Sequence, residues 1–281
     1  MTATTAVSRM RAVFGPTHYQ PTTAWGPIQA VVVLIAAEVL VGIVLAVAGI
    51  AIMRATDPSP LLHLLEAVRQ GAAIPAALAS LPRTLVLGYM MASSVLLLGA
   101  AWWLAKRGGL RAADVLALRA PIGGGWRLLL ICVVAAIVVA AGYALHYAYA
   151  VHYAATGPSL GGEAQGGGDW VDYVPALGWP VSVVSIGIAG PLVEEVWFRG
   201  FLLPAFARTR LGFWGANLAT SALFAASHAL QYTPDQLVPV FLVGVVFAWV
   251  VGLTGSIWVP VALHMCINLL LLLWVWLLAL A

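Results

Sequence analysis

Charged residues are scarce in this chain. Only 8% of its 281 residues are Asp, Glu, Lys or Arg, while 63% are hydrophobic, and a soluble domain carries roughly a quarter charged residues. This scarcity excludes an ordinary soluble protein. The net charge is +3, but the arginines lie between apolar stretches without a basic stripe of interleaved aromatic residues, which excludes a nucleic-acid partner.

Cysteine is also scarce, and the sequence has no internal repeat. The two cysteines, Cys132 and Cys266, both fall inside apolar stretches, where no disulfide framework is implied, and we expect them to be buried packing residues. The absence of a repeat gives no support to a transporter built from two inverted halves.

Long hydrophobic runs, by contrast, recur throughout the chain. About 20 apolar residues can cross a hydrocarbon core roughly 30 Å thick. We predict seven spans, at about 28–53, 84–105, 127–150, 177–207, 213–231, 237–253 and 257–280. The first is too long, and too far behind a polar tail, for a cleavable signal peptide. The predicted fold class is all-α: a polytopic membrane helical bundle with about seven transmembrane helices.

The basic residues between these spans predict the orientation. One side of the membrane receives most of them: Arg9, Arg11, Lys106, Arg107, Arg111, Arg119, Arg127, Arg208 and Arg210. The opposite side receives Arg54, Arg69 and Arg83. The positive-inside rule then places the N-terminus in the cytoplasm and, with seven spans, the C-terminus outside. We expect an integral protein of the plasma membrane.

The chain divides into regions of different composition. Residues 1–27 form a polar, cytoplasmic tail, residues 28–176 hold the first spans, and residues 177–281 hold the later spans, which we expect to form the catalytic core. In the middle region, 54–83 and 106–120 are charged segments that suit interfacial helices, and 156–172 is a glycine-rich outer loop.

Ionisable residues enter the spans mainly in the last region. Such residues commonly cost about 2.5–3.5 kcal/mol each at mid-span, so each is by default a functional hypothesis. They are Glu194, Glu195 and Arg199 in the fourth span, His228 in the fifth, and His264 with the polar Asn268 in the seventh. Glu38 in the first span stands apart, and we expect it to make a helix-packing hydrogen bond in its protonated form.

Helical spacing assigns the ionisable residues of the fourth span to different faces of the helix. Glu195 and Arg199 are four residues apart, acid first, and can pair. Glu194 projects about 100° away from Glu195, so it is free to face a cavity. The preceding Gly187, Gly190 and Pro191 should loosen the helix just before the glutamates.

The later spans repeat the same spacing. Phe224 and His228 are four apart, and so are His264 and Asn268, so each pair occupies one helix face. A free glutamate, two histidines and an asparagine on three late helices favour one shared site.

Three short patterns occur in order on separate predicted helices: EEVWFR at 194–199, FAASH at 224–228 and HMCIN at 264–268. They match EExxxR, FxxxH and HxxxN. Over about 177–271 the chain thereby resembles the CPBP family of intramembrane proteases, which includes the prenyl-protein CAAX endopeptidase and bacterial Abi proteins linked to bacteriocin processing or immunity. The resemblance implies an all-helical membrane protease whose partner is a membrane-associated or lipidated protein or peptide substrate.

The resemblance also implies a role for each motif residue. Glu194 with His228 would activate the attacking water, His264 with Asn268 would stabilise the oxyanion, and Arg199 would hold Glu195. Hydrolysing an amide needs an activated water and a donor for the developing negative oxygen, so the chemistry agrees. This mechanism needs no cofactor.

Some alternatives stay open. There is no HExxH helix or GxSxG elbow, and Cys266 lies on nearly the opposite helix face from His264. Glu194, His228 and His264 would also make a His₂Glu zinc site, although we favour the metal-free mechanism because of the resemblance. The same residues could form a proton or ion relay, or the chain could be a catalytically silent partner of another membrane protein. The sequence does not identify the substrate.

Overall fold

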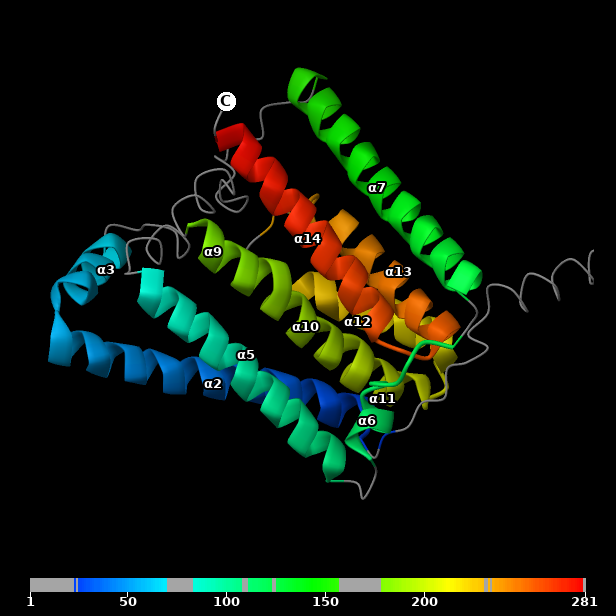
Figure 1. The fold of residues 1–281 in the computed structure, drawn as a ribbon, viewed down its shortest axis with the longest axis horizontal. Coiled ribbons are helices and arrows are strands. Elements are labelled where there is room, and N and C mark those ends of the chain that lie inside the picture. Colours follow the sequence, from blue (N-terminus) through cyan, green and yellow to red (C-terminus); the bar gives the residue numbers. More distant parts are fainter. Residues whose placement is uncertain are drawn as a thin grey trace, which may run out of the picture.

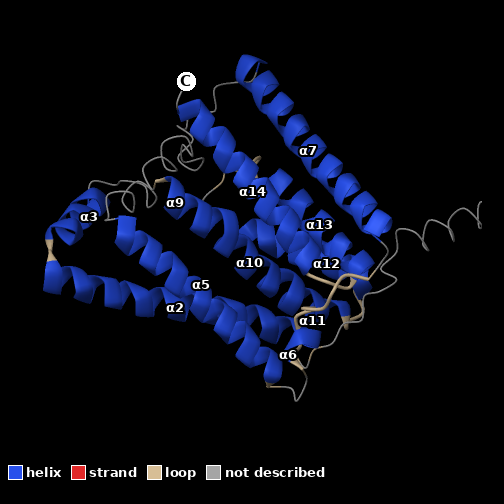
Figure 2. Cartoon of the chain, viewed as in Figure 1, coloured by secondary structure: helices blue, strands red, loops and turns tan. Residues whose placement is uncertain are grey.

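The computed structural model describes residues 23, 25–69, 83–107, 111–122, 125–156, 178–229, 232 and 234–279. Every regular element in these ranges is a helix (Figure 2), so the all-α prediction is confirmed for this part of the chain. Most of the predicted N-terminal tail, and nearly all of the predicted glycine-rich loop at 156–172, lie outside the described residues.

The long helices follow the predicted apolar stretches. The N-terminal half forms α2 (Pro27–Thr56), α5 (Arg83–Lys106) and α7 (Gly125–Thr156). The fourth stretch forms one interrupted helix of successive segments: α9 (Trp179–Ser182), η1 (Val183–Ala189), α10 (Gly190–Glu195), η2 (Val196–Leu202) and α11 (Leu203–Ala207). The remaining stretches form α12 (Gly212–Ser227), α13 (Leu237–Thr254) and α14 (Trp258–Ala279).

Fewer candidate spans are found than predicted. In the described part of the chain, five helices are long and apolar enough to cross a membrane: Pro27–Thr56, Leu85–Lys106, Trp179–Ala207, Leu237–Thr254 and Trp258–Leu277. α12 has only 16 residues, about 24 Å at 1.5 Å per residue, which is short of the hydrocarbon core. Within α7, Leu128–Gly142 is an apolar stretch shorter than the five candidate spans in the part of the chain that the structure describes.

The two charged connectors contain short helices. α3 (Ser59–Arg69) lies in 54–83 and α6 (Ala112–Val115) in 106–120. α3 exposes Leu62 and Leu65 beside an exposed ion pair in which Arg69 lies 2.8 Å from Glu66. Apolar and charged side chains on one exposed helix suit a membrane surface. The placement of α3 at the interface stays a prediction.

The interrupted helix lies in the middle of the bundle. Figure 1 shows α2 and α5 on one side of it and α12, α13 and α14 on the other, with α7 outermost against α13 and α14. Most of η2 and α11 is buried, including Trp197, Phe201 and Leu203. The glutamates therefore lie on a helix that the rest of the described bundle largely encloses.

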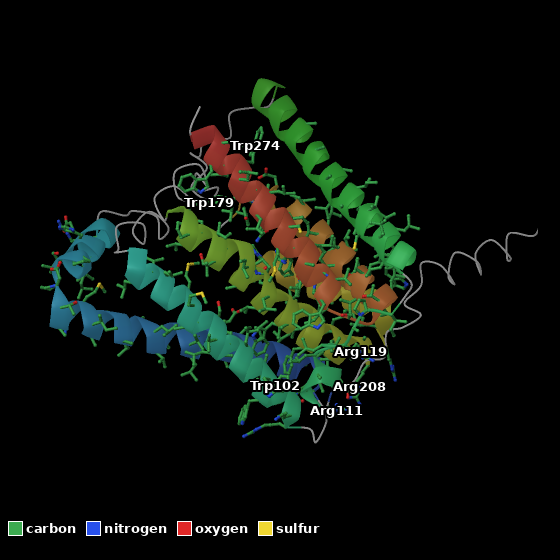
Figure 3. All side chains as sticks on the ribbon, viewed as in Figure 1. Trp102, Arg111, Arg119, Trp179, Arg208 and Trp274 are labelled. Carbon is green, nitrogen blue, oxygen red and sulfur yellow. The ribbon has the colours of Figure 1, made fainter. Side chains whose placement is uncertain are left out.

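Hydrogen bonds join several helix ends at one end of the bundle. The Trp25 indole Nε1 donates to the Leu104 carbonyl oxygen at 3.1 Å, and the Ile122 amide donates to the Thr254 carbonyl oxygen at 2.9 Å. Figure 3 shows Arg111, Arg119 and Arg208 gathered at this end, and Trp179 and Trp274 at the other. These three arginines thus lie at one end of the bundle, while the side of the membrane they face stays a prediction.

The interrupted helix widens on both sides of the glutamates. η1 and η2 are π-helical, each seven residues long, and α10 between them has six. Pro191 near the start of α10 has no N–H to donate to the preceding turn, which disrupts the regular ladder. The predicted loosening before the glutamates is therefore present in η1. Single π-helical turns inside α-helices occur frequently at functional sites.

Gly200 in η2 allows the chain after α6 to pack on the interrupted helix. A Cβ added to Gly200 would lie 3.0 Å from the Leu116 carbonyl oxygen and 3.3 Å from the Leu116 Cα. Backbone atoms cannot rotate away as a side chain can. The close approach therefore requires a glycine.

We predict that Gly200→Ala lowers the free energy of unfolding by about 1–3 kcal/mol through overpacking. The matched control is Gly99→Ala in α5, where an added Cβ meets nothing within 4 Å. The control should be neutral or more stable, by up to about 1 kcal/mol, because alanine is favoured over glycine in a helix. Thermal unfolding in detergent measures both, and equal stability of the two variants would contradict the close packing.

Candidate functional site

A fully buried carboxylate lies at the centre of the candidate site. The Glu195 side chain is 0% exposed, and its Oε1 accepts hydrogen bonds from Arg199 Nη1 at 3.0 Å and from His264 Nδ1 at 3.0 Å. The predicted ion pair between Glu195 and Arg199 is therefore formed. The contact with His264 joins α10 to α14 across 69 residues of sequence.

Arg199 extends this network to α13. Its Nη2 donates to the Gly244 carbonyl oxygen at 3.3 Å. The guanidinium carbon lies 4.4 Å from the centre of the Phe224 ring and 5.6 Å from that of Phe247, in range for cation–π attraction. Aromatic faces and one carboxylate thus replace water around a cation that is only 2% exposed.

His264 lies between the two glutamates. While its Nδ1 contacts Glu195, its Nε2 lies 3.7 Å from Glu194 Oε2. The Glu194 side chain is 30% exposed, so the adjacent glutamates have different surroundings, as their 100° separation on the helix predicts. Sequence spacing grouped His264 with Asn268 and did not reveal that His264 contacts both glutamates.

His228 directly follows the last turn of α12. Its Nδ1 is 2.8 Å from the Phe224 carbonyl oxygen, and its ring stacks on Tyr232 with a centroid distance of 5.8 Å. A carbonyl oxygen can only accept, so we assign the proton to Nδ1 and the free lone pair to Nε2. Within the described residues, Glu194 and His228 form no hydrogen bond with each other. Their joint activation of a water molecule stays a prediction.

Asn268 holds α14 against the widened segment. Its Nδ2 donates to the Ile186 carbonyl oxygen in η1 at 2.9 Å. An asparagine amide has two N–H donors, so one stays available for another acceptor. The predicted oxyanion role of Asn268 thus depends on the second N–H, a restriction that the HxxxN pattern alone does not show.

Glu38 belongs to the surroundings of the site. Its carboxylate interacts electrostatically with Glu194 and His228. It continues the α2 face that carries Ala30 and Leu34, which are buried against the core, because the three residues are spaced by four. Glu38 itself is exposed and makes no hydrogen bond within the described residues. The expected helix-packing hydrogen bond is therefore wrong.

The side chains of the alternative zinc site are not assembled as a ligand set among the described residues. Among the described residues, no three His, Cys, Asp or Glu side chains are placed to hold a metal ion together. That search covers Glu194, His228 and His264, because all of them are described. Both cysteines are free, and neither contacts a site histidine through any described hydrogen bond. The expectation that both are buried is wrong, because Cys132 is only partly buried and Cys266 is exposed on α14. The geometry instead supplies carboxylates, imidazoles and an amide at one place in the bundle.

Known proteins are similar to the part of the chain that holds this site. Residues 176–270 match the protein family described as "Rce1-like: Type II CAAX prenyl endopeptidase Rce1-like". An Escherichia coli protein named "Uncharacterized 24.3 kDa protein" is 36% identical over 86 residues, which are 30% of this chain and 40% of that protein. A Bacillus subtilis (strain 168) protein named "Putative membrane peptidase YdiL" is 29% identical over 114 residues, which are 39% of this chain and 42% of that protein.

The chain spans about two fifths of the length of these relatives, 40% and 42%. No solved structure matches the chain. The family match covers the interrupted helix, α12, α13 and the site part of α14, and it contains EEVWFR, FAASH and HMCIN. Residues 176–270, with their ordered motifs gathered around one buried carboxylate, are thus similar to the Rce1-like family of type II CAAX prenyl endopeptidases.

Proposed function

We propose that this protein is an intramembrane endopeptidase that hydrolyses a peptide bond with water activated by Glu194 and His228. The observation that carries the proposal is the pair of adjacent glutamates with opposite surroundings. Glu195 is 0% exposed and bonded to Arg199, whereas Glu194 is 30% exposed and lies 3.7 Å from His264. One carboxylate is thus committed to holding the site, and the other is available to accept a proton.

The proposed reaction starts with proton removal. Glu194 accepts a proton from water, with the free Nε2 of His228 orienting that water, and the water oxygen bonds to the scissile carbonyl carbon. His264 and the second N–H of Asn268 stabilise the negative oxygen that forms. The carbon–nitrogen bond then breaks, and the abstracted proton moves to the leaving amine nitrogen. The products are a carboxylic acid and an amine, so atoms and charges balance.

We propose a membrane-associated or lipidated protein or peptide as the substrate. The matched family is described by CAAX prenyl endopeptidase activity, and the site lies on helices that are apolar enough to be embedded in lipid. A prenylated C-terminal segment suits this setting, and so does a bacterial leader peptide. We further propose that the end carrying Arg111, Arg119 and Arg208 faces the cytoplasm, together with the N-terminus.

We predict that Glu194→Gln, His228→Ala and His264→Ala each abolish cleavage of a farnesylated CAAX peptide by the purified protein. Each change removes a proton acceptor or donor from the proposed reaction. Glu66→Gln on the exposed helix α3 is the control, because it also removes one carboxylate but lies outside the site. Turnover near the wild-type rate in any of the three variants would remove that residue from the proposed mechanism.

Asn268→Ala should lower kcat by about 10²–10³ with little change in KM, since losing one oxyanion donor has this effect in other hydrolases. The variant also loses the bond to Ile186, which typically contributes about 0.5–1.5 kcal/mol to stability. Steady-state kinetics and thermal unfolding separate the two effects. A stability loss without a fall in kcat would assign Asn268 to helix packing alone.

Arg199→Ala should destabilise the protein by about 3–5 kcal/mol, because Glu195 would remain buried without its cationic partner. Arg69→Ala breaks the exposed pair with Glu66, whose side chains are 77% and 47% exposed, and should leave stability nearly unchanged, because water screens the pair. Chemical or thermal unfolding in the same detergent compares the two variants. Equal effects would mean that burial does not set the strength of the Arg199 pair.

A further inference from the structure

Glu195 receives two donors on one oxygen, and this fixes its charge. Arg199 cannot be deprotonated in a protein, and its Nη1 lies 3.0 Å from Glu195 Oε1. A neutral Glu195 would carry its proton on Oε2, which is buried without a hydrogen-bond partner among the described residues. An unpaired oxygen costs free energy in either form, so the adjacent guanidinium decides, because it attracts the negative form of the carboxylate. Glu195 is therefore ionised.

The charge of Glu195 determines where His264 carries its proton. An ionised carboxylate can only accept hydrogen bonds, so His264 Nδ1, at 3.0 Å from Oε1, must be the donor. We assign the Nδ1–H tautomer to His264 on this hydrogen bond. Its Nε2 then carries a lone pair, 3.7 Å from Glu194 Oε2. In this form His264 cannot donate from Nε2 to a negative oxygen.

We propose that Glu195 is a positioning residue that holds His264 as the Nδ1–H tautomer, so that His264 becomes an oxyanion donor only after taking at Nε2 the proton that Glu194 removes from water. The proposal rests on the proposed peptidase function and deepens it. A carboxylate that orients an imidazole and stabilises its protonated form works in this way in serine hydrolases.

The proton balance is complete without another reagent. Water loses one proton to Glu194 as its oxygen bonds to the carbonyl carbon. The proton passes to His264 Nε2, which restores the Glu194 carboxylate and makes His264 an imidazolium whose Nε2–H donates to the oxyanion. When the carbon–nitrogen bond breaks, His264 returns this proton to the amine nitrogen and becomes neutral again.

Charged groups and aromatic rings surround His264. The charged groups that face it are Glu194 and Glu195 of α10 and, through Glu195, Arg199 of η2. The rings of Phe224 and Phe247, with centroids 6.1 and 5.2 Å from that of His264, cover it from α12 and α13 and carry no charge. Two carboxylates and one guanidinium leave a net negative charge, which an imidazolium neutralises.

The first test measures the tautomer directly and needs no substrate. Protein labelled with ¹⁵N-histidine is compared by NMR with His264→Gln, which identifies the His264 signals. We expect Nδ1 to be protonated and Nε2 unprotonated in the wild type. Glu195→Gln should reverse or mix the tautomers, because a glutamine amide can donate to Nδ1. Arg199→Lys is the matched control: it weakens the same buried pair but leaves Glu195 ionised, and should keep the wild-type tautomer.

The second test is kinetic. Glu195→Gln should lower kcat on the order of 10⁴-fold with KM nearly unchanged, as loss of the tautomer-fixing carboxylate does in serine hydrolases, and Arg199→Lys should lower it far less. An Nε2–H tautomer in the wild type, or equal losses of kcat in the two variants, would overturn the proposal. If the protein cleaves no peptide but the NMR result is as expected, the peptidase function fails while the positioning by Glu195 stands.

Discussion

A carboxylate buried away from water must be matched by positive charge and hydrogen-bond donors, or its ionised form is strongly destabilised. Glu195 is such a group, and the donors that satisfy it come from different helices. Arg199 lies one turn further along the interrupted helix and His264 lies on α14, while Arg199 also bonds to Gly244 on α13. Satisfying this one carboxylate therefore fixes the relative positions of the helices that carry the motif residues.

The widened segments of the interrupted helix complete this arrangement. η1 offers the Ile186 carbonyl oxygen to Asn268, so α14 is tied to the interrupted helix at two levels, through His264 and through Asn268. Between η1 and η2, the α10 turn directs Glu195 into the protein and leaves Glu194 partly exposed. Adjacent residues of identical chemistry thus acquire opposite surroundings, which is the condition for one of them to hold the site while the other reacts.

Local spacing is the part of this architecture that the sequence predicts well. The pairing of Glu195 with Arg199, the helical class and the loosened turn near Pro191 all follow from contacts within a few residues or from composition. Hydropathy alone does not register that α12 has only 16 residues, and five of the seven predicted spans are candidate spans among the described residues.

Contacts between helices are the part that sequence spacing cannot supply. His264 meets Glu195 across 69 residues, and Glu38 reaches the surroundings of Glu194 and His228 from a helix outside the family match. Helix rotation and tilt decide these contacts, and both are set by packing of the whole bundle. In the sequence, Glu38 is a lone carboxylate on an otherwise apolar helix. This indicates a functional role, but it does not predict which residues lie near Glu38.

The central claim is that the residues gathered around Glu195 cut peptide bonds in the membrane. The most direct measurement is quantitative proteomics of protein termini in membranes from cells that carry the wild-type chain or Glu194→Gln at equal abundance. The account predicts a set of new N- and C-termini, from membrane-associated proteins, that is present with the wild type and absent with the variant. Identical termini in the two membranes, with both proteins folded and inserted, would contradict it.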